Sequence, residues 1–188
     1  MVDRVKNKIA LVTGAAQGLG KTMSELLIQE GAQVILTDIN EDLLEKTATE
    51  LDAPFKVLDV TEPEAWQNVI AEIEKDYGKL HVLINNAGIL RDKSFAKMEW
   101  SDFVTVVNVH LMGSALCAHT VFPIMKEQEY GRIIMTSSSS GLFGNFGQTN
   151  YGAAKMGVVG LMNTLKLEGA KYNIHTNSVA PTATTRMT

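Results

Sequence analysis

The sequence predicts an α/β fold, in which helices cover both faces of a doubly wound parallel sheet to form three αβα layers. Short apolar runs rich in β-branched residues alternate along the chain with longer amphipathic stretches. The short runs are apolar almost throughout, as strands are when both faces are covered. Because strand-to-strand crossovers are right-handed, this alternation places helices on both sides of one sheet.

Each predicted strand is followed by a helix, except for the last. Strands are expected at residues 8–13, 33–37, 55–58, 80–84, 132–136 and 174–179. Helices are expected at residues 19–30, 41–51, 62–76, 99–126 and 149–172. No repeat or linker interrupts the pattern, so residues 1–188 are predicted to form a single domain.

The composition is that of an ordinary globular protein, with 45% hydrophobic and 20% charged residues. A net charge of −4 argues against nucleic-acid binding, which needs a positive field. The only cysteine, Cys117, lies in a predicted helix; we expect a packed thiol and a cytoplasmic location. The charged N-terminus does not resemble a secretory signal, and no run of about 18 apolar residues predicts a membrane span.

A glycine-rich turn, Thr13–Gly20 (TGAAQGLG), joins the first strand to the first helix. Glycines at 14, 18 and 20 allow the backbone to approach a ligand closely or to adopt positive φ. A pyrophosphate could then lie at the N-terminus of the helix. The spacing is TGxxxGxG rather than GxGxxG, and a plain glycine-rich turn is the alternative interpretation.

Asp38 ends the second predicted strand, 18 residues after Gly20. A carboxylate at this place can accept hydrogen bonds from an adenosine ribose diol and would repel a 2′-phosphate. Residues 15–17 and Ile39 include no Arg or Lys. The sequence therefore predicts NAD rather than NADP, although Asp38 could also be a turn residue before Asn40.

Tyr151 and Lys155 lie four residues apart in the last predicted helix, and this spacing puts both on one face. A nearby ammonium favours phenolate and is expected to lower the pKa of the tyrosine. Such a phenol can exchange a proton with an alcohol or a carbonyl. A surface pair is the alternative, but a serine cluster at residues 137–140 precedes the helix at the end of a strand, where ligand crevices form.

Seven motifs stand in an order that resembles the short-chain dehydrogenase/reductase family in its compact single-domain form. This resemblance implies a Rossmann-like sheet and a nicotinamide-dependent oxidoreductase acting on an alcohol/ketone pair. The motifs are Thr13–Gly20, Asp59-Val60, Asn85-Asn86-Ala87-Gly88, Asn108, Ser138, Tyr151–Lys155 and Asn177-Ser178-Val179-Ala180-Pro181.

The resemblance implies four catalytic residues. Ser138 would polarise the substrate oxygen, with Ser139 as the nearest rival for this role. Tyr151 would be the general acid/base. Lys155 would hold the nicotinamide ribose and depress the pKa of Tyr151, and Asn108 would support a water that links Lys155 to solvent.

The resemblance also implies the residues that would bind the cofactor. Asp59 and the backbone of Val60 would contact the adenine, and residues 86–88 would support the central strand and the adenosine. The expected set is Thr13, Gly14, Gln17, Gly18, Leu19, Gly20, Asp38, Asp59, Val60, Asn86, Ala87, Gly88, Tyr151, Lys155, Pro181 and Thr182. The histidines at 81, 110, 119 and 175 lack ligand spacing, so no metal is expected.

The segments 90–95, 109–113 and 144–148 and the ending 180–188 are similar to (3R)-hydroxyacyl-CoA dehydrogenase domains. The first half looks more like 3-oxoacyl-acyl-carrier-protein reductases and hydroxysteroid dehydrogenases. We therefore expect a 3-hydroxyacyl thioester as substrate, with a steroid or another secondary alcohol as the alternative. The resemblance further implies a homodimer or homotetramer through helices 99–126 and 149–172, which carry apolar residues on both sides; burial against the sheet is the alternative.

The sequence departs from the family at its C-terminal end. Family members usually continue through a substrate lid, a further helix and a seventh strand, none of which follows Thr188. A threonine for the nicotinamide carboxamide could be Thr184, Thr185 or Thr188. The expectation is a fragment, an edge strand covered by a partner, or a protein that binds the dinucleotide with little catalysis.

Overall fold

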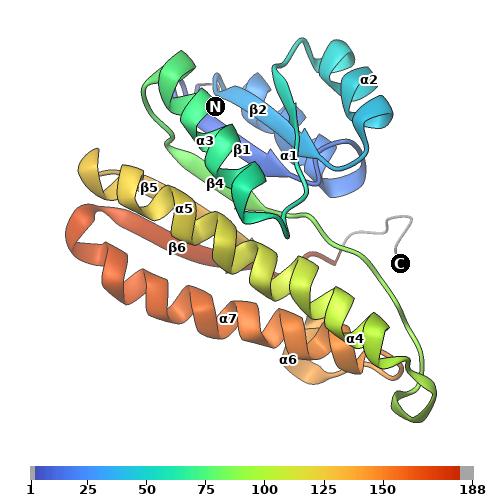
Figure 1. Ribbon diagram of the computed structural model, residues 1–188. Coiled ribbons are helices and arrows are strands. Elements are labelled where there is room, and N and C mark those ends of the chain that lie inside the picture. Colours follow the sequence, from blue (N-terminus) through green and yellow to red (C-terminus); the bar gives the residue numbers. More distant parts are fainter. Residues whose placement is uncertain (1–2, 183–188) are drawn as a thin grey trace.

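The computed structural model describes residues 3–182, which form one parallel sheet flanked by helices (Figure 1). The sheet has six strands in the order β3-β2-β1-β4-β5-β6. Its strands are β1 (Ile9–Thr13), β2 (Gln33–Asp38), β3 (Phe55–Val57), β4 (Val82–Asn85), β5 (Gly131–Thr136) and β6 (Ile174–Val179). The α/β doubly wound, Rossmann-like fold class is thereby confirmed.

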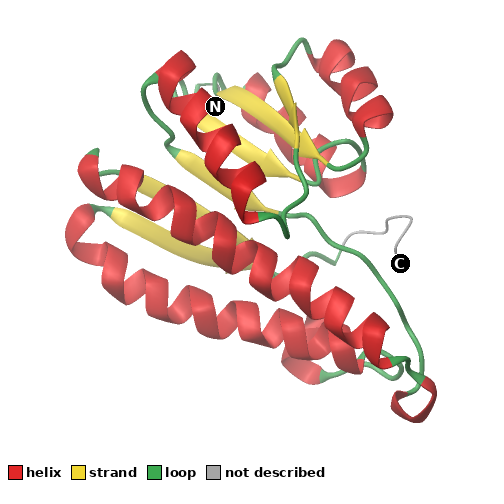
Figure 2. Cartoon of the chain, viewed as in Figure 1, coloured by secondary structure: helices red, strands yellow, loops and turns green. Residues whose placement is uncertain are grey.

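The helices cover the sheet in two layers (Figure 2). They are α1 (Gly18–Gln29), α2 (Glu41–Leu51), α3 (Pro63–Tyr77), α4 (Trp100–Val107), η2 (Asn108–Met112), α5 (Gly113–Glu127), α6 (Ser139–Phe143) and α7 (Thr149–Gly169), with short 3-10 turns η1 (Phe95–Lys97) and η3 (Ala170–Tyr172). Leu11 and Ile133 pack towards α3, α5 and α7, whereas Val12 and Leu36 pack towards α1 and α2. Alternate residues of each strand thus contribute side chains to two hydrophobic cores, one on each face of the sheet.

The helix predicted over residues 99–126 is not one regular α-helix. It consists of α4, the π-helical turn η2 and α5, and the Gly113 N–H donates to the Asn108 carbonyl across that wider turn. Short π-turns of this kind arise where an extra residue is accommodated within a helix, and they are frequent at functional sites. The sequence also did not predict η1 and α6, which are too short to show a periodicity.

One sheet face is covered less completely than the sequence predicts. Along β5 and β6, alternate residues are fully buried, while Ile134 is half-buried and His175, Asn177 and Val179 are exposed. Within residues 3–182, β6 packs mainly against β5 and α7, on the fully buried side. The α1/α2 layer therefore covers β1 and β2 but does not extend across β5 and β6.

One helical stretch, Trp100–Glu127, could cross a membrane by length and hydropathy alone, because an 18-residue window in it has a mean hydropathy of 1.3. The sequence analysis had predicted no such stretch, since it counted uninterrupted apolar runs. In the fold, these residues form α4, η2 and α5, and Val121 and Met125 are fully buried against the sheet. Core helices pass the same hydropathy test, because they too need apolar side chains.

The buried indole of Trp66 provides a test of the core between α3 and the sheet. Its ring is fully buried and its Nε1–H donates to the Val60 carbonyl at 3.2 Å. Trp66→Phe leaves a cavity and an unpaired carbonyl, so we expect a loss of about 2–4 kcal/mol in the free energy of unfolding, measured in urea. Leu167→Ala, at an exposed site of α7, should change it by less than about 0.5 kcal/mol. Equal effects of the two substitutions would contradict this packing.

Candidate active site

The candidate site lies where the strands end. All six strands are parallel, so the C-terminal residues of β1, β2, β4 and β5 meet at one edge of the sheet. The strand order reverses between β1 and β4, because β2 lies on one side of β1 and β4 on the other. Ligands of doubly wound sheets bind at such a reversal point.

The glycine-rich turn leaves β1 at this edge and needs its glycines. Gly14 and Gly18 have φ angles of +63° and +56°, which favour glycine. A Cβ at Gly14 would lie 2.8 Å from the Ala87 Cα, and a Cβ at Gly20 would overlap the Gly14 carbonyl oxygen. The turn is therefore packed against the end of β4 and against itself, which a plain connecting turn would not require.

Thr13 and Asn86 fix this turn to the end of β4. The Thr13 Oγ1 accepts hydrogen bonds from the backbone N–H groups of Asn86 and Ala87, both at 3.0 Å. The Asn86 Nδ2 in turn donates to the carbonyls of Thr13 and Gly14, at 3.0 and 3.1 Å. The structure thus brings these predicted cofactor residues together and assigns to Asn86 the role of bracing the turn.

The N-terminus of α1 provides a place for an anion. Gln17 precedes the helix in extended conformation, its side chain makes no capping hydrogen bond, and the first turn holds no acidic residue. Gln17 and Gly18 are exposed and Leu19 is half-buried. Uncapped helical N–H groups carry partial positive charge and suit a phosphate, so this turn fits the pyrophosphate of a dinucleotide.

Asp38 lies beside the glycine turn with its carboxylate held in place. Its Oδ2 accepts from the Ala16 N–H at 3.1 Å and its Oδ1 from the Asn40 N–H at 3.0 Å. The side chain is half-buried at the end of β2. Asp38 therefore does stabilise the turn before Asn40, as the alternative interpretation holds. Its contact with Ala16 also places the carboxylate at the edge of the sheet where an adenosine ribose would lie.

Asp59 and Val60 follow β3 at the same edge. The Asp59 Oδ1 accepts from the Thr61 N–H at 2.9 Å and from the Thr61 hydroxyl at 2.7 Å, and this fixes the local turn. Val60 is buried and lies against Gly113, where a Cβ would be 3.0 Å from the Val60 Cγ2. The Leu58 N–H donates to the Asp38 carbonyl at 2.9 Å, so this turn and Asp38 form one rim.

Tyr151, Lys155 and Ser138 come together at the end of β5. Tyr151 is half-buried in the first turn of α7, and Ser138 lies near enough to its phenol to lower the pKa of that group. Ser138 precedes α6, and its Oγ accepts from the Ser140 N–H at 3.2 Å. Ser139, the rival from the sequence, is exposed on α6. The structure therefore places Ser138 next to the phenol.

The pKa of Tyr151 moves in the direction opposite to the predicted one. Burial of the phenol raises its pKa above the ordinary value, and the nearby Ser138 side chain offsets only part of this; the negative charge of Asp92 adds to the rise. The Lys155 Nζ lies 5.5 Å from the centre of the Tyr151 ring and donates instead to the Thr136 carbonyl at 2.6 Å. The ammonium is thus engaged with the backbone rather than with the phenol oxygen.

Lys155 is almost completely buried, which is unusual for a lysine. Burial without a carboxylate partner lowers the pKa of its ammonium to about 8. The charge on this group therefore depends on pH close to neutrality. Such perturbed pKa values are typical of residues that take part in proton transfer.

The predicted proton relay through Asn108 stays a prediction, and the structure brings His110 of the same segment to Tyr151. Asn108 is exposed in η2; its N–H donates to the Thr105 and Val104 carbonyls, and its carbonyl accepts from the Gly113 N–H. His110, two residues further on, is buried, and its ring contacts the ring of Tyr151. The spacing of the histidines in the sequence does not suit a metal site, and it does not indicate this contact with Tyr151. The available signal was a single histidine within an apolar helical run, VHLMG.

The imidazole of His110 is held tightly by the segment after β4. Its Nε2 lies 2.8 Å from the Ile89 carbonyl oxygen and 3.0 Å from the Ile89 nitrogen. A Cβ at Gly88 would overlap the Cε1 of His110, so only glycine fits there. Burial and the charge of Lys155 lower the pKa of His110 to about 3, so the ring is uncharged at neutral pH.

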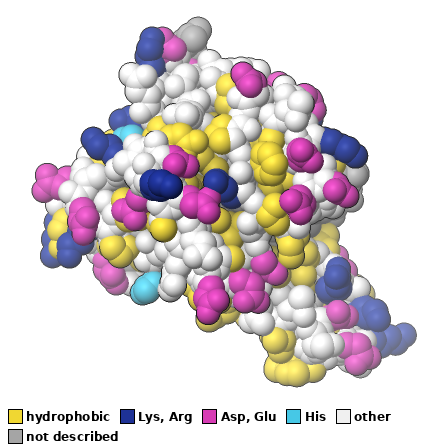
Figure 3. Space-filling model, turned by 45° about the horizontal axis from the view of Figure 1, so that its top comes forward, with side chains coloured by type: hydrophobic (Ala, Val, Ile, Leu, Met, Phe, Trp, Pro, Cys, Tyr) yellow, Lys and Arg dark blue, Asp and Glu magenta, His cyan; other side chains and the backbone are white. Residues whose placement is uncertain are grey.

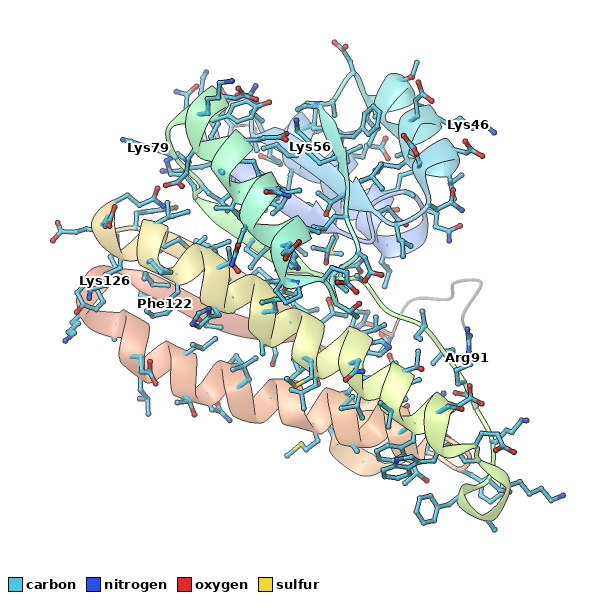
Figure 4. All side chains as sticks on the ribbon, viewed as in Figure 1. Lys46, Lys56, Lys79, Arg91, Phe122 and Lys126 are labelled. Atoms are coloured by element: carbon cyan, nitrogen blue, oxygen red, sulfur yellow. The ribbon has the colours of Figure 1, made fainter. Side chains whose placement is uncertain are left out.

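The segment between β4 and α4 leaves the sheet at the C-terminal end of β4, and Figure 4 shows Arg91 on this extended stretch. It is tied to the loop before α7: the Lys93 N–H donates to the Gly147 carbonyl at 2.9 Å, and Gln148 donates to Asp92 at 2.7 Å. Asn150, fully buried, donates to the Arg91 carbonyl at 3.1 Å. These contacts form one wall of the site.

The predicted cofactor-binding residues after β6 show few contacts in the structure. Pro181 is half-buried and Thr182 is exposed after β6, and the structure shows no hydrogen bond of their side chains. The three candidate threonines at 184, 185 and 188 lie outside the described residues. Within residues 3–182, no group of three or more His, Cys, Asp or Glu side chains could hold a metal ion.

Comparisons with known proteins support the geometry. The sequence profile of short chain dehydrogenases matches residues 8–188. A short-chain type dehydrogenase/reductase of Mycobacterium tuberculosis is 42% identical over 98% of this chain and 69% of its own length.

Two further relatives carry more specific names. A peroxisomal hydratase-dehydrogenase-epimerase of Saccharomyces cerevisiae is 44% identical over 97% of this chain, which spans 22% of the yeast protein. A 3-oxoacyl-(acyl-carrier-protein) reductase of Thermotoga maritima is 42% identical over 95% of this chain, which spans 74% of that reductase. The similarity thus covers almost the whole chain but only part of each relative.

The neutral, buried His110 predicts a pH dependence of stability. In the unfolded chain a histidine is protonated below its ordinary pKa of about 6.5, whereas folded His110 resists protonation down to about 3. Stability is therefore fully present above about pH 6.5 and lost as the pH falls towards 3. Between pH 7 and pH 4.5, we expect His110 to account for a loss of up to about 3 kcal/mol in the free energy of unfolding. Urea denaturation of the wild type and of His110→Asn at both pH values measures it; parallel curves for the two proteins would contradict the burial of a neutral ring.

Proposed function

This chain belongs to the short-chain dehydrogenase family, and from that premise we propose that it interconverts a secondary alcohol and a ketone, with NAD as cofactor and a 3-hydroxyacyl/3-oxoacyl thioester as substrate. Oxidoreductase activity and a nicotinamide dinucleotide follow from the family. The observation that carries the reaction is the gathering of Tyr151, Ser138 and the buried Lys155 at the end of β5, with the Lys155 Nζ 5.5 Å from the centre of the Tyr151 ring. Two hydroxyl groups and an ammonium near the reversal point of the sheet can bind and protonate a substrate oxygen.

The proposed chemistry divides between the cofactor and the side chains. The bound nicotinamide supplies or accepts the hydride at its C4 atom. The Ser138 hydroxyl donates a hydrogen bond to the substrate oxygen and polarises it. Because burial keeps the phenol of Tyr151 protonated, it is ready to donate a proton when a ketone is reduced. In the oxidation direction, Tyr151 must first lose its proton, so oxidation should accelerate as the pH rises.

Lys155 supports this proton transfer by its charge. Its ammonium has the Thr136 carbonyl as hydrogen-bond partner in this structure, and two further N–H donors can reach ribose hydroxyls. A cation in a buried position acts strongly on a neighbouring phenol, because screening by water is weak there. Lys155 would thereby lower the pKa of Tyr151 when a ligand draws the ammonium away from Thr136.

The preference for NAD rests on the fixed carboxylate of Asp38. Two backbone N–H groups hold this carboxylate next to the glycine turn. Both oxygens still have lone pairs for the ribose diol, whereas a 2′-phosphate would meet a negative charge.

The proposed acyl thioester draws on two observations. The names of the relatives include a hydratase-dehydrogenase-epimerase and a 3-oxoacyl-(acyl-carrier-protein) reductase. In addition, apolar side chains lie exposed next to Ser138, on α6 and on the loop that follows it: Leu142, Phe143 and Phe146, the last with 90% of its surface accessible. An acyl chain is a ligand that could cover them.

A homodimer or homotetramer and a cytoplasmic location belong to the same proposal. Trp100, Met112 and Met156 are exposed apolar residues on α4, η2 and α7, whereas Val158 belongs to the core and Leu161 and Leu165 pack against it. On the face in Figure 3, acidic and basic side chains are interspersed, with apolar side chains between them. Sizing in solution tests the assembly, and a monomer would contradict it.

The proposed cytoplasmic location rests on the single, buried Cys117, and cell fractionation tests it.

Tyr151→Phe tests the proposed acid/base. Removing the hydroxyl should lower turnover by at least about 100-fold, because proton transfer contributes about that much or more, while NAD binding stays within about threefold. The assay follows NADH formation with a (3R)-hydroxyacyl-CoA, a steroid alcohol and a simple secondary alcohol. The matched control is Tyr77→Phe, on the distant helix α3.

If Tyr151→Phe keeps most of the activity, the proposed mechanism is wrong. If the wild type turns over only the steroid alcohol, the proposed thioester substrate is wrong. Binding of NAD without turnover of any alcohol by the wild type would favour a dinucleotide-binding protein.

Asp38→Ala tests the choice of cofactor. Loss of the carboxylate removes both the ribose acceptor and the repulsion of a 2′-phosphate. We expect the ratio of NAD to NADP affinity to fall by at least about tenfold, which corresponds to one charge-assisted hydrogen bond. Titration calorimetry with both dinucleotides measures the ratio. The control is Glu45→Gln, which removes one negative charge on the exposed side of α2. An unchanged ratio in Asp38→Ala would contradict the proposed role.

A further inference from the structure

We propose that His110 is a positioning residue for the proton-transfer pair: its ring fixes the orientation of the Tyr151 phenol, and its buried, unpartnered Nδ1 is a hydrogen-bond acceptor. This inference rests on the proposed role of Tyr151 in proton transfer. It adds a residue that lies in a different helical segment from the Ser138, Tyr151 and Lys155 cluster.

The first support is the contact between the two rings. The centres of the His110 and Tyr151 rings are 5.0 Å apart and their planes meet at 87°, an edge-to-face arrangement. His110 has only 2% of its surface exposed, and Tyr151 is half-buried. The half-buried phenol therefore packs against a buried neighbouring ring.

The second support is that the imidazole itself cannot move. The wide turn of η2 carries it towards the end of β4, where Gly88 has no side chain and leaves room for the ring. On its other edge, Nε2 meets the backbone of Ile89 at 2.8 and 3.0 Å. A ring held by Gly88, Ile89 and Tyr151 at once can transmit the position of the β4 segment to the phenol.

The third support is an unpaired nitrogen. Four buried side-chain atoms in the described part of the chain have no hydrogen-bond partner, and among them only the Nδ1 of His110 belongs to a residue in contact with Tyr151. Nε2 lies within hydrogen-bond distance of both the Ile89 carbonyl, at 2.8 Å, and the Ile89 N–H, at 3.0 Å. We assign the proton to Nε2, which then donates to the closer carbonyl, and the neutral ring presents a lone pair at Nδ1. A buried acceptor without a partner is costly, so such a nitrogen favours a nearby donor.

The charged and titratable groups around His110 identify that donor. Lys155 on α7 is close enough to affect the protonation of His110, Tyr151 lies on the same helix, and Asp92 reaches Tyr151 from the segment after β4. Of these, Lys155 carries N–H groups that can satisfy Nδ1 through a water, because Nδ1 has no direct partner and one N–H of the ammonium is engaged with the Thr136 carbonyl. An acceptor there favours the charged lysine, and a charged lysine favours the phenolate.

Two substitutions of similar shape distinguish the role of the His110 Nδ1 from that of its Nε2. The amide of His110→Asn reaches the place of Nδ1, and the amide of His110→Gln reaches the place of Nε2. We expect His110→Gln to raise the pKa of Tyr151 and to lower alcohol oxidation at pH 7 by roughly three- to tenfold, since one pKa unit corresponds to a tenfold change in phenolate. His110→Asn should keep the pKa of Tyr151 within about 0.3 units of the wild type. A merely structural role would lower stability without this split.

The readouts are the pH profile of turnover and the ultraviolet titration of Tyr151, taken as the difference from Tyr151→Phe so that no catalysis is needed. If both His110 variants titrate like the wild type, or if both shift equally, the inference is wrong, even where Tyr151→Phe abolishes turnover. If Tyr151→Phe keeps its turnover, the proposed function itself has failed.

A measurement on the wild type covers the case that a variant does not fold. Nitrogen NMR of the labelled imidazoles should show His110 neutral, protonated at Nε2, with an Nδ1 shift that follows the ionisation of Tyr151. An Nδ1 signal that is unaffected by this ionisation, or a ring protonated at Nδ1, would overturn the inference.

Discussion

The hydrogen bonds between Thr13 and Asn86 hold the site together. They join the ends of β1 and β4 at the point where the strand order reverses. The glycine turn is fixed by them on one side, and the segment of Ala87, Gly88 and Ile89 is fixed on the other. Because Gly88 and Ile89 then hold His110, and His110 contacts Tyr151, the dinucleotide turn and the phenol belong to one packed unit. A displacement of β4 would therefore shift both the glycine turn and the Tyr151 phenol.

Burial sets the electrostatics of this unit. The pKa of Tyr151 is raised, and those of Lys155 and His110 are lowered, to about 8 and about 3. In each case the first cause is removal from water, which disfavours the charged form. At neutral pH, Tyr151 and His110 are therefore uncharged, whereas Lys155 still carries most of its positive charge. Ligand binding would change which hydrogen bonds Lys155 makes, and so would change the protonation of Tyr151.

The π-turn at residues 108–112 explains why the His110 side chain is buried against Tyr151 while the Asn108 side chain is exposed. In a regular helix, residues two apart lie on nearly opposite sides. The turn η2 buries His110 and leaves Asn108 exposed. A motif match in the sequence identifies the segment but not which of its side chains faces inward, because one extra residue per turn rotates the helix surface.

From the sequence alone we could predict the fold class, five of the six strands to within a residue or so at each end, and the glycine turn, Asp38, Tyr151 and Lys155 as candidate site residues. These predictions follow from local patterns: apolar runs, the spacing of the glycines, and the four-residue spacing of a helix; Ser138 follows from the family resemblance. The folded chain is needed to see that Lys155 donates to Thr136, that the pKa of Tyr151 is raised, that β5 and β6 are covered on one face by the described helices, and that His110 contacts Tyr151. Each of these depends on burial and on contacts between residues far apart in the chain, and no spacing along the sequence encodes them.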